Sequence, residues 1–174
     1  REGTVRRLRG ASCRNFSYLV PLTALIMELN DKKFAVLVDA DNISHRKIKD
    51  ILDEIANYGT PTIKRIYGDF TNPKFAAWKE VLLENSITPI QQYAYTTGKN
   101  ATDSALIIDA MDILYTGNVD GFVLVTSDSD FTRLAIRLRE AGKLVVGIGE
   151  LKTPRPFTVS CHHSVSYTHL RAHE

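Results

Sequence analysis

The sequence predicts an α/β protein with three layers, α/β/α, around a mainly parallel sheet of five to six strands. Short apolar runs alternate with segments of helical periodicity between residues 34 and 148. Several of these runs are apolar on both faces, as expected of strands that helices cover on both sides. Strands that alternate with helices form βαβ units, whose right-handed crossovers produce a parallel sheet.

The predicted strands are short runs rich in branched and aromatic residues. They span residues 34–38, 62–67, 87–93, 122–125 and 144–148. The first helix follows Ser44, a favoured N-cap residue, and its apolar residues at 48, 51, 52 and 55 follow helical spacing. Asn72-Pro73 opens the second helix, because proline is favoured at the first helical position. Two further helices are predicted over about 101–114 and 130–140.

One domain is expected over residues 27–163, because a chain of 174 residues suits a single core. Residues 1–26 contain five arginines and one glutamate, so they carry more than the whole net charge of +2. We interpret 1–26 as an upstream or disordered segment before Met27, with a basic targeting segment as the alternative. Residues 164–174 resemble a translated sequencing adapter, and a natural disordered tail is the alternative.

The composition limits the function classes. Without 1–26 the chain is slightly acidic, so any attraction for phosphate must be local rather than global. The two cysteines, Cys13 and Cys161, are far apart and form neither a disulfide framework nor a zinc-ligand spacing, which favours a cytoplasmic location. No run is long and apolar enough for a transmembrane helix, so no membrane partner is expected.

Acidic residues follow two of the predicted strands. The first strand ends in Asp39-Ala-Asp-Asn42, and the fourth ends in Thr126-Ser-Asp-Ser-Asp130. In an open parallel sheet, ligands bind beyond the carboxyl ends of the strands, so adjacent strands would bring these carboxylates together. Helix capping is the alternative interpretation, although one Asp is enough for one cap.

The third predicted helix adds Asp103. On a helical wheel, Ala110 and Leu114, with residue 107, share the face of Asp103, whereas Asp109 and Asp112 are predicted to point to solvent. Asp103 therefore heads the stripe that packs on the sheet. The helix dipole also favours an acid in the first turn, but it does not explain the face.

Three carboxylates at one place repel each other. Repulsion and burial would raise the pKa values of Asp39, Asp103 and Asp128, and a divalent cation would remove the conflict. Carboxylate oxygens suit Mg²⁺ or Mn²⁺. The pattern therefore predicts a metal site at the carboxyl edge of the sheet.

Five segments carry a family resemblance: Ala35–Asn42, Ile66–Phe70, Tyr95–Asp112, Val125–Phe131 and Gly147–Phe157. Together they make residues 34–163 similar to the NYN domain of the LabA-like group, within the PIN-like nuclease superfamily. The resemblance implies a Rossmann-like (PIN-like) sheet and a Mg²⁺- or Mn²⁺-dependent endoribonuclease that leaves 5′-phosphate and 3′-hydroxyl ends. The implied catalytic and metal-binding acids are Asp39, Asp103, Asp128 and Asp130.

Polar residues near these acids are candidates for contact with RNA, either single-stranded or structured. Asn42, Thr126 and Ser127 can hold water or a phosphate oxygen, with turn and cap chemistry as an equal alternative. Lys99 precedes the third-helix acid by four residues and could meet a phosphate.

Basic and aromatic side chains supply further candidates for this interface. Arg133 and Arg137 flank the acids of the fourth strand end and could follow the RNA backbone, or remain solvated. Tyr67, Phe70 and Tyr95 could stack on bases or pack in the core.

The chain departs from the family pattern after Cys161, where an acidic residue and a final strand are usual and His162-His163 stands instead. The last strand, and the winged-helix OST-HTH/LOTUS domain that often follows in this group, would then be missing. A homodimer is compatible with the sequence.

Two other functions fit parts of the pattern. Asp39-Ala-Asp-Asn-Ile43 resembles the opening of haloacid-dehalogenase phosphatases, in which the first aspartate is a nucleophile, although Ile43 departs from that pattern. A non-catalytic RNA-binding or regulatory module would keep the acids without turnover.

Overall fold

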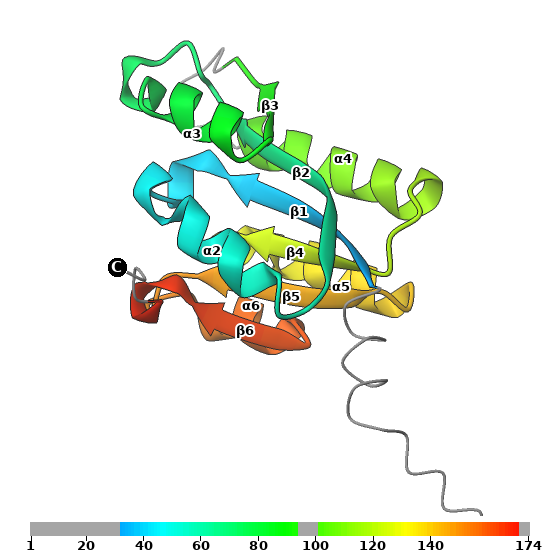
Figure 1. Ribbon diagram of the computed structural model, residues 1–174. Helices are drawn as coiled ribbons and strands as arrows, with labels where there is room; N and C mark the ends of the chain where they lie inside the picture. Colours follow the sequence, from blue (N-terminus) through cyan, green and yellow to red (C-terminus); the bar gives the residue numbers. More distant parts are fainter. Residues whose placement is uncertain (1–31, 94–100, 171–174) are drawn as a thin grey trace, which may run out of the picture.

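The computed structural model describes residues 32–93 and 101–170. These residues form one six-stranded sheet with the order β3-β2-β1-β4-β5-β6 (Figure 1). The strands are β1 Lys33–Asp39, β2 Thr60–Gly68, β3 Thr88–Gln91, β4 Gly121–Val125, β5 Leu144–Gly149 and β6 His163–Ser166. All five predicted runs are strands, and every neighbouring pair is parallel, so the predicted α/β fold is confirmed.

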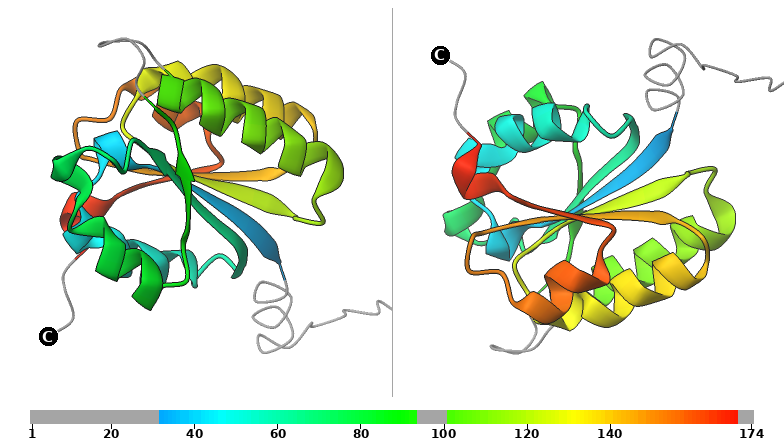
Figure 2. Two further views of the ribbon diagram at one scale, coloured as in Figure 1. Left: turned by 90° about the horizontal axis from the view of Figure 1, so that it is seen from above. Right: turned by 90° about the horizontal axis from the view of Figure 1, so that it is seen from below.

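Helices cover both faces of the sheet and complete the three layers (Figure 2). On one face lie α2 Ile48–Ile55 and α3 Trp78–Glu84; on the other lie α4 Ala101–Thr116, α5 Thr132–Glu140 and α6 Arg155–Ser160. In the described part of the chain, none of these helices is long and apolar enough to cross a bilayer. The predicted upstream segment 1–26, Lys99 and Tyr95 lie outside the described residues.

The two predicted helix starts differ in their caps. Asn72 accepts a hydrogen bond from the backbone N of Lys74 at 3.1 Å and caps the 3-10 turn Pro73–Phe75, whereas α3 itself begins at Trp78. Ser44 makes no capping hydrogen bond with its side chain. The segment after it begins as a short 3-10 turn, His45–Lys47, before α2 starts at Ile48, so the predicted cap is wrong.

The central strand β1 is buried on both faces. Val36 and Val38 pack into the core beneath α2 and α3, whereas Ala35 and Leu37 pack into the core beneath α4 and α5. This two-sided burial explains why the strand reads as an uninterrupted apolar run. Because side chains alternate along a strand, the next residue after Val38, Asp39, faces the α4 side.

A sixth strand completes the sheet, within the five to six strands that the sequence predicts. β6 pairs in parallel with β5 at the edge of the sheet, from Val146↔His163 to Gly149↔Ser166. The backbone N of His162 donates to the carbonyl of Val145 at 2.8 Å and leads the chain into the pairing. Half of this strand is exposed, which leaves no apolar run to reveal it in the sequence.

Candidate metal centre at the carboxyl edge of the sheet

The end of β1 places one carboxylate at the centre of the sheet edge. Asp39 is 1% exposed and accepts three hydrogen bonds. The backbone N of Asp41 donates to Oδ1 at 3.0 Å, Thr126 Oγ1 donates to Oδ2 at 3.1 Å, and the Asn42 amide also donates to Oδ2. Burial raises the pKa of Asp39, and these three donors oppose the rise without cancelling it.

The neighbouring strand, β4, leads into the second acidic segment. Thr126 is 1% exposed and its hydroxyl accepts a hydrogen bond from the backbone N of Asp128 at 3.1 Å. The same hydroxyl donates to Asp39, so Thr126 connects the acids that follow two adjacent strands. Asp128 Oδ1 in turn accepts from the backbone N of Asp130 at 2.9 Å.

Capping, the alternative interpretation of these acids, does occur. Asp39 and Asp128 each accept a hydrogen bond from the backbone N two residues on, at the start of a short 3-10 turn. The cap on Asp128 uses only Oδ1. The caps therefore fix both loops, and Oδ2 of Asp128 takes no part in its cap.

Three of the four predicted acids lie together. Asp103, in the first turn of α4, joins Asp128 and Asp130, and one oxygen of each lies within 4.8 Å of the others. Asp39 does not belong to this set of mutually close oxygens. Asp103 and Asp128 are partly buried and Asp130 is exposed, so the set opens to solvent on one side.

The electrostatics of this cluster favour a cation. Burial, followed by the charges of Asp39, Asp128 and Asp130, raises the pKa of Asp103 to about 6. Carboxylates that repel each other this strongly are stabilised by a divalent ion, and hard oxygen ligands suit Mg²⁺ or Mn²⁺. The chemistry of the donor set therefore fits the metal that the sequence pattern implies.

Asn42 and Ser127, two predicted substrate-binding residues, have partners inside the protein. The Asn42 amide donates to Asp39, and Ser127 Oγ accepts from the backbone N of Glu150 at 2.8 Å. Both side chains therefore hold the loops around the acids. Arg133 is exposed on α5, and Lys99 lies outside the described residues. Arg137 instead lies over the ring of Tyr115, with its guanidinium carbon 5.9 Å from the centroid.

The structure corrects the interpretation of two residues on the α4 side. Tyr67 is fully buried, so it packs in the core and does not present a ring to a base. Its hydroxyl donates to Asp109, which also pairs with Arg65, so the prediction that Asp109 points to solvent is wrong. Asp112 is exposed, as predicted.

A rotation of α4 explains the error. Leu106 and Ile113 are buried, whereas the predicted stripe residue at 107 is only partly buried. The face that contacts the sheet is therefore turned toward Leu106, which brings Asp109 to its border. The helical wheel placed Asp103 near this face, and the structure leaves it at the opposite border, beside the strand ends.

Two contacts around the centre had no signal in the sequence. Lys74 Nζ lies 2.6 Å from Asp41 Oδ1 and joins the loop after β2 to the loop after β1. Tyr167, after β6, donates to Glu150 Oε1 at 3.1 Å. Both pairs join residues that are far apart in the chain, and only the sheet order brings them together.

Comparisons with known proteins agree with this architecture. An uncharacterized protein of Methanocaldococcus jannaschii is 27% identical over 123 residues, which make up 68% of this chain and 48% of that protein. The chain thus spans about half the length of this curated relative. The crystal structure of a protein of unknown function from Vibrio parahaemolyticus is similar, with a TM-score of 0.65 at 18% identity. The match covers 79% of this chain and 93% of that chain, and it supports the fold alone.

A protein-family model, described as NYN domain, matches residues 33–168. The match begins with β1, includes Asp39, Asp103, Asp128 and Asp130, and extends beyond β6. It covers well over half of the 174 residues. The chain therefore belongs to the NYN domain family.

Proposed function

We propose that this NYN domain is a metal-dependent endoribonuclease whose Asp103, Asp128 and Asp130 hold one Mg²⁺ or Mn²⁺. The observation that carries the proposal is the set of three carboxylate oxygens within 4.8 Å of one another. Membership of the NYN domain family, which resembles PIN-like nucleases, supports the proposal. When bound, the ion would lower the pKa of a water molecule and stabilise negative charge on the phosphoryl group.

Asp39 has a different part in this proposal. Its carboxylate is held by three donors and lies near enough to raise the pKa of Asp103, although it is outside the set of close oxygens. We assign it to orient water at the centre and to complete the negative field of the site. Asn42 and Thr126 keep it in place, so they are positioning residues.

Exposed Asp130 is the acid that solvent and substrate reach most easily. In our proposal it orients the attacking water toward the phosphorus, in line with the leaving 3′-oxygen. The products would then carry 5′-phosphate and 3′-hydroxyl ends. Local cations, Lys74 beside the β1 loop and Arg133 on α5, would contact the RNA backbone.

A phosphatase that uses Asp39 as its nucleophile is disfavoured by the geometry. A nucleophilic carboxylate needs access to the phosphorus of the substrate. Asp39 is 1% exposed, and Oδ2 already accepts from both Asn42 and Thr126. The partly buried carboxylates in front of it are therefore the better candidates for chemistry.

The test is cleavage of a 5′-labelled single-stranded RNA in Mn²⁺ or in EDTA, with Asp128→Asn as the variant. Asp112→Asn is the matched control, because it is an exposed acid on α4 outside the cluster. Circular dichroism confirms that each protein folds. We expect cleavage only with Mn²⁺, full activity in the control and a loss of at least about 100-fold in Asp128→Asn, as for other electrostatic groups in active sites.

Intact RNA after incubation of folded wild type with Mn²⁺ would refute the nuclease proposal. Binding of that RNA without cleavage would then favour a non-catalytic module. Cleavage that persists in EDTA, or that Asp128→Asn does not reduce, would instead exclude the carboxylates as the source of the activity.

A further inference from the structure

A pocket lies on the α3 side of the sheet, beside the edge strand β3. Its volume is about 410 Å³. The residues that line it come from the loop after β2, from the 3-10 turn Pro73–Phe75, from α3 and the residues just before it, and from β3. They are Phe70, Phe75, Ala76, Lys79, Leu82, Pro89 and Gln91.

Lys74 joins a wall of this pocket to Asp41, in the loop that follows β1. The register pairs Asp39 with Tyr67, so β1 and β2 end side by side and the loop containing Phe70 begins at the same edge of the sheet. Lys74 Nζ contacts Asp41 Oδ1 at 2.6 Å and lies 4.5 Å from the ring centroid of Phe75. One ammonium group therefore stands between the loop that follows Asp39 and a wall of the pocket.

The walls combine aromatic surface with one fixed carboxamide. Phe70 is partly buried, and its ring lies 5.8 Å from that of Phe75. Gln91 Oε1 accepts from the backbone N of Phe70 at 2.9 Å, and Gln91 Nε2 donates to Asp69 at 2.7 Å. These two bonds fix the orientation of the amide. A carboxamide has two N–H donors and two acceptor lone pairs, so Gln91 keeps the capacity for one more bond of each kind.

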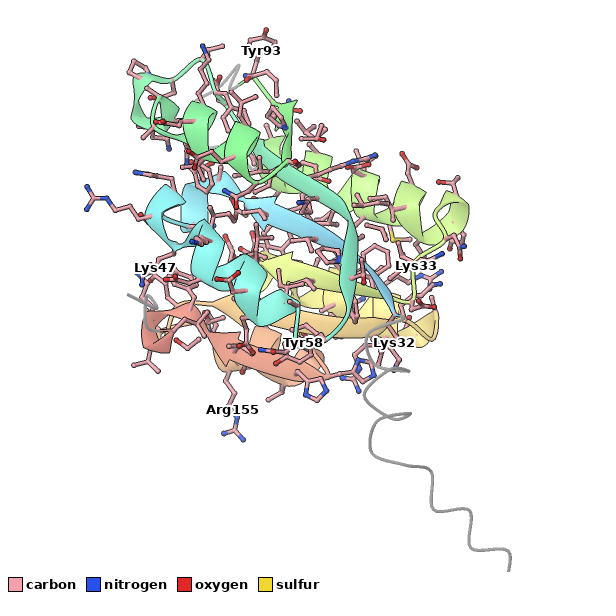
Figure 3. The ribbon with its side chains drawn as sticks, viewed as in Figure 1. Lys32, Lys33, Lys47, Tyr58, Tyr93 and Arg155 are labelled. Atoms are coloured by element: carbon pink, nitrogen blue, oxygen red, sulfur yellow. The ribbon has the colours of Figure 1, made fainter. Side chains whose placement is uncertain are left out.

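A cationic side chain lines the pocket. Of the residues that line the pocket, Lys79 alone is charged, and its side chain is exposed. Tyr93 follows β3 two residues after Gln91, is 53% exposed, and projects from this end of the molecule (Figure 3). An aromatic slot, an amide that can read a hydrogen-bonding edge and lysines beside it are the groups that recognise an unpaired base and its phosphate.

We propose that this pocket binds one unpaired nucleobase of the RNA whose phosphodiester lies at the carboxylates. The inference rests on the proposed nuclease function and assigns a specificity site to it. The base stacks on Phe70, its edge bonds to the Gln91 amide, and the adjoining phosphates pass Lys74 and Lys79. The volume lies within the range of roughly 300–1,000 Å³ for small-molecule sites, which is sufficient for a base with its ribose.

A pocket that takes up one base predicts a preference for single-stranded RNA. A base enters the pocket only when it is unpaired and turned away from its neighbours. A duplex keeps its bases stacked inside, so it cannot fill the slot. The nuclease would accordingly cut at a fixed distance from one recognised nucleotide.

The experiment uses a set of short synthetic single-stranded RNAs, each with one abasic nucleotide at a successive position around a mapped cleavage site. Single-turnover cleavage in Mn²⁺ is measured with wild type, Phe70→Leu and Lys79→Glu. Lys33→Glu is the control. Lys33 is an exposed lysine at the start of β1, at the end of the strands opposite to the carboxylates (Figure 3). Lys79→Glu changes an exposed side chain and therefore keeps the test valid if Phe70→Leu folds poorly.

We expect one abasic position to reduce wild-type cleavage by roughly 5- to 100-fold, the range for one base stacked on an aromatic ring. Phe70→Leu should reduce cleavage of intact RNA and no longer distinguish the abasic RNA at that position. Lys79→Glu should weaken cleavage of all the RNAs, and Lys33→Glu should match wild type.

Two results would overturn the inference and separate it from the nuclease proposal. If wild type cuts every abasic RNA equally well, or Phe70→Leu keeps the full abasic effect, the pocket does not bind a base although the nuclease function stands. The pocket would then be a candidate docking site for a protein. If wild type neither binds nor cuts RNA, both proposals fail together.

Discussion

Asp103→Asn is expected to change stability in opposite directions with and without a divalent ion. In the metal-free protein, burial and the charges of Asp39, Asp128 and Asp130 raise the pKa of Asp103 from 3.8 to about 6. Folding therefore opposes ionisation of this carboxyl. The resulting loss of stability is complete above the folded pKa, is absent below the unfolded pKa, and grows as the pH rises between the two.

The magnitude follows from the shift. A pKa displacement of about two units corresponds to about 3 kcal/mol, and solvent screening at this partly exposed position reduces the figure. At neutral pH, Asp103→Asn should accordingly raise the free energy of unfolding of the metal-free protein by about 1–2 kcal/mol. The gain in stability should vanish at a pH below both the folded and the unfolded pKa, where Asp103 is protonated in both states.

Saturation with metal should make Asp103→Asn less stable than wild type. A ligand at a hundredfold excess over its Kd stabilises the folded state by about 2.7 kcal/mol, and Asp103→Asn removes one of the three carboxylates that provide this binding. Urea unfolding in EDTA and in Mn²⁺ measures both effects, with Asp112→Asn as the control. A variant that is less stable than wild type in EDTA, or that gains as much from Mn²⁺, would refute the reasoning.

Three further substitutions test other parts of the site. Thr126→Val removes the donor to Asp39 and a buried acceptor, so urea unfolding should show a loss of about 1–3 kcal/mol, with slower RNA cleavage. Tyr67→Phe leaves Asp109 without its hydroxyl donor and should cost about 1–2 kcal/mol with cleavage unchanged; reduced cleavage would contradict our assignment of Tyr67 to the core. Lys74→Ala should weaken RNA binding and reduce the magnitude of the slope of log K against log salt concentration by about 0.7, as measured by anisotropy titrations. An unchanged slope would exclude a phosphate contact.

The strands could be predicted because burial on both faces leaves a direct trace in the sequence. β1, β4 and β5 are almost entirely buried, and each reads as an apolar run. β6 has no such trace, since its side chains are partly or fully exposed and its backbone supplies the pairing with β5. The other edge strand, β3, is also partly exposed and was found in the sequence, but with bounds of 87–93 instead of Thr88–Gln91, so the sequence predicts the central strands more accurately than the edges.

The rotation of α4 could not be predicted for a related reason. Ile108 is 63% exposed, although the residues around it include buried Leu106 and Ala110. A helix with apolar residues on several sides gives a weak periodicity, so a wheel drawn from the sequence allows more than one buried face. The wheel therefore allows Asp109 to face solvent, whereas in the structure Asp109 contacts Tyr67 of β2 and lies beside the sheet.

The acids of the centre differ in how firmly the fold holds them. Thr126 ties the carboxylate of Asp39 to the backbone of Asp128, so both residues are held at the ends of the central strands. Asp103 reaches the cluster from α4, and within the described part of the chain no hydrogen bond ties its side chain to those strands. Its repulsion from its neighbours opposes the approach of the helix end to the sheet. A cation turns that repulsion into attraction, so binding of metal and docking of the first turn of α4 should be coupled events.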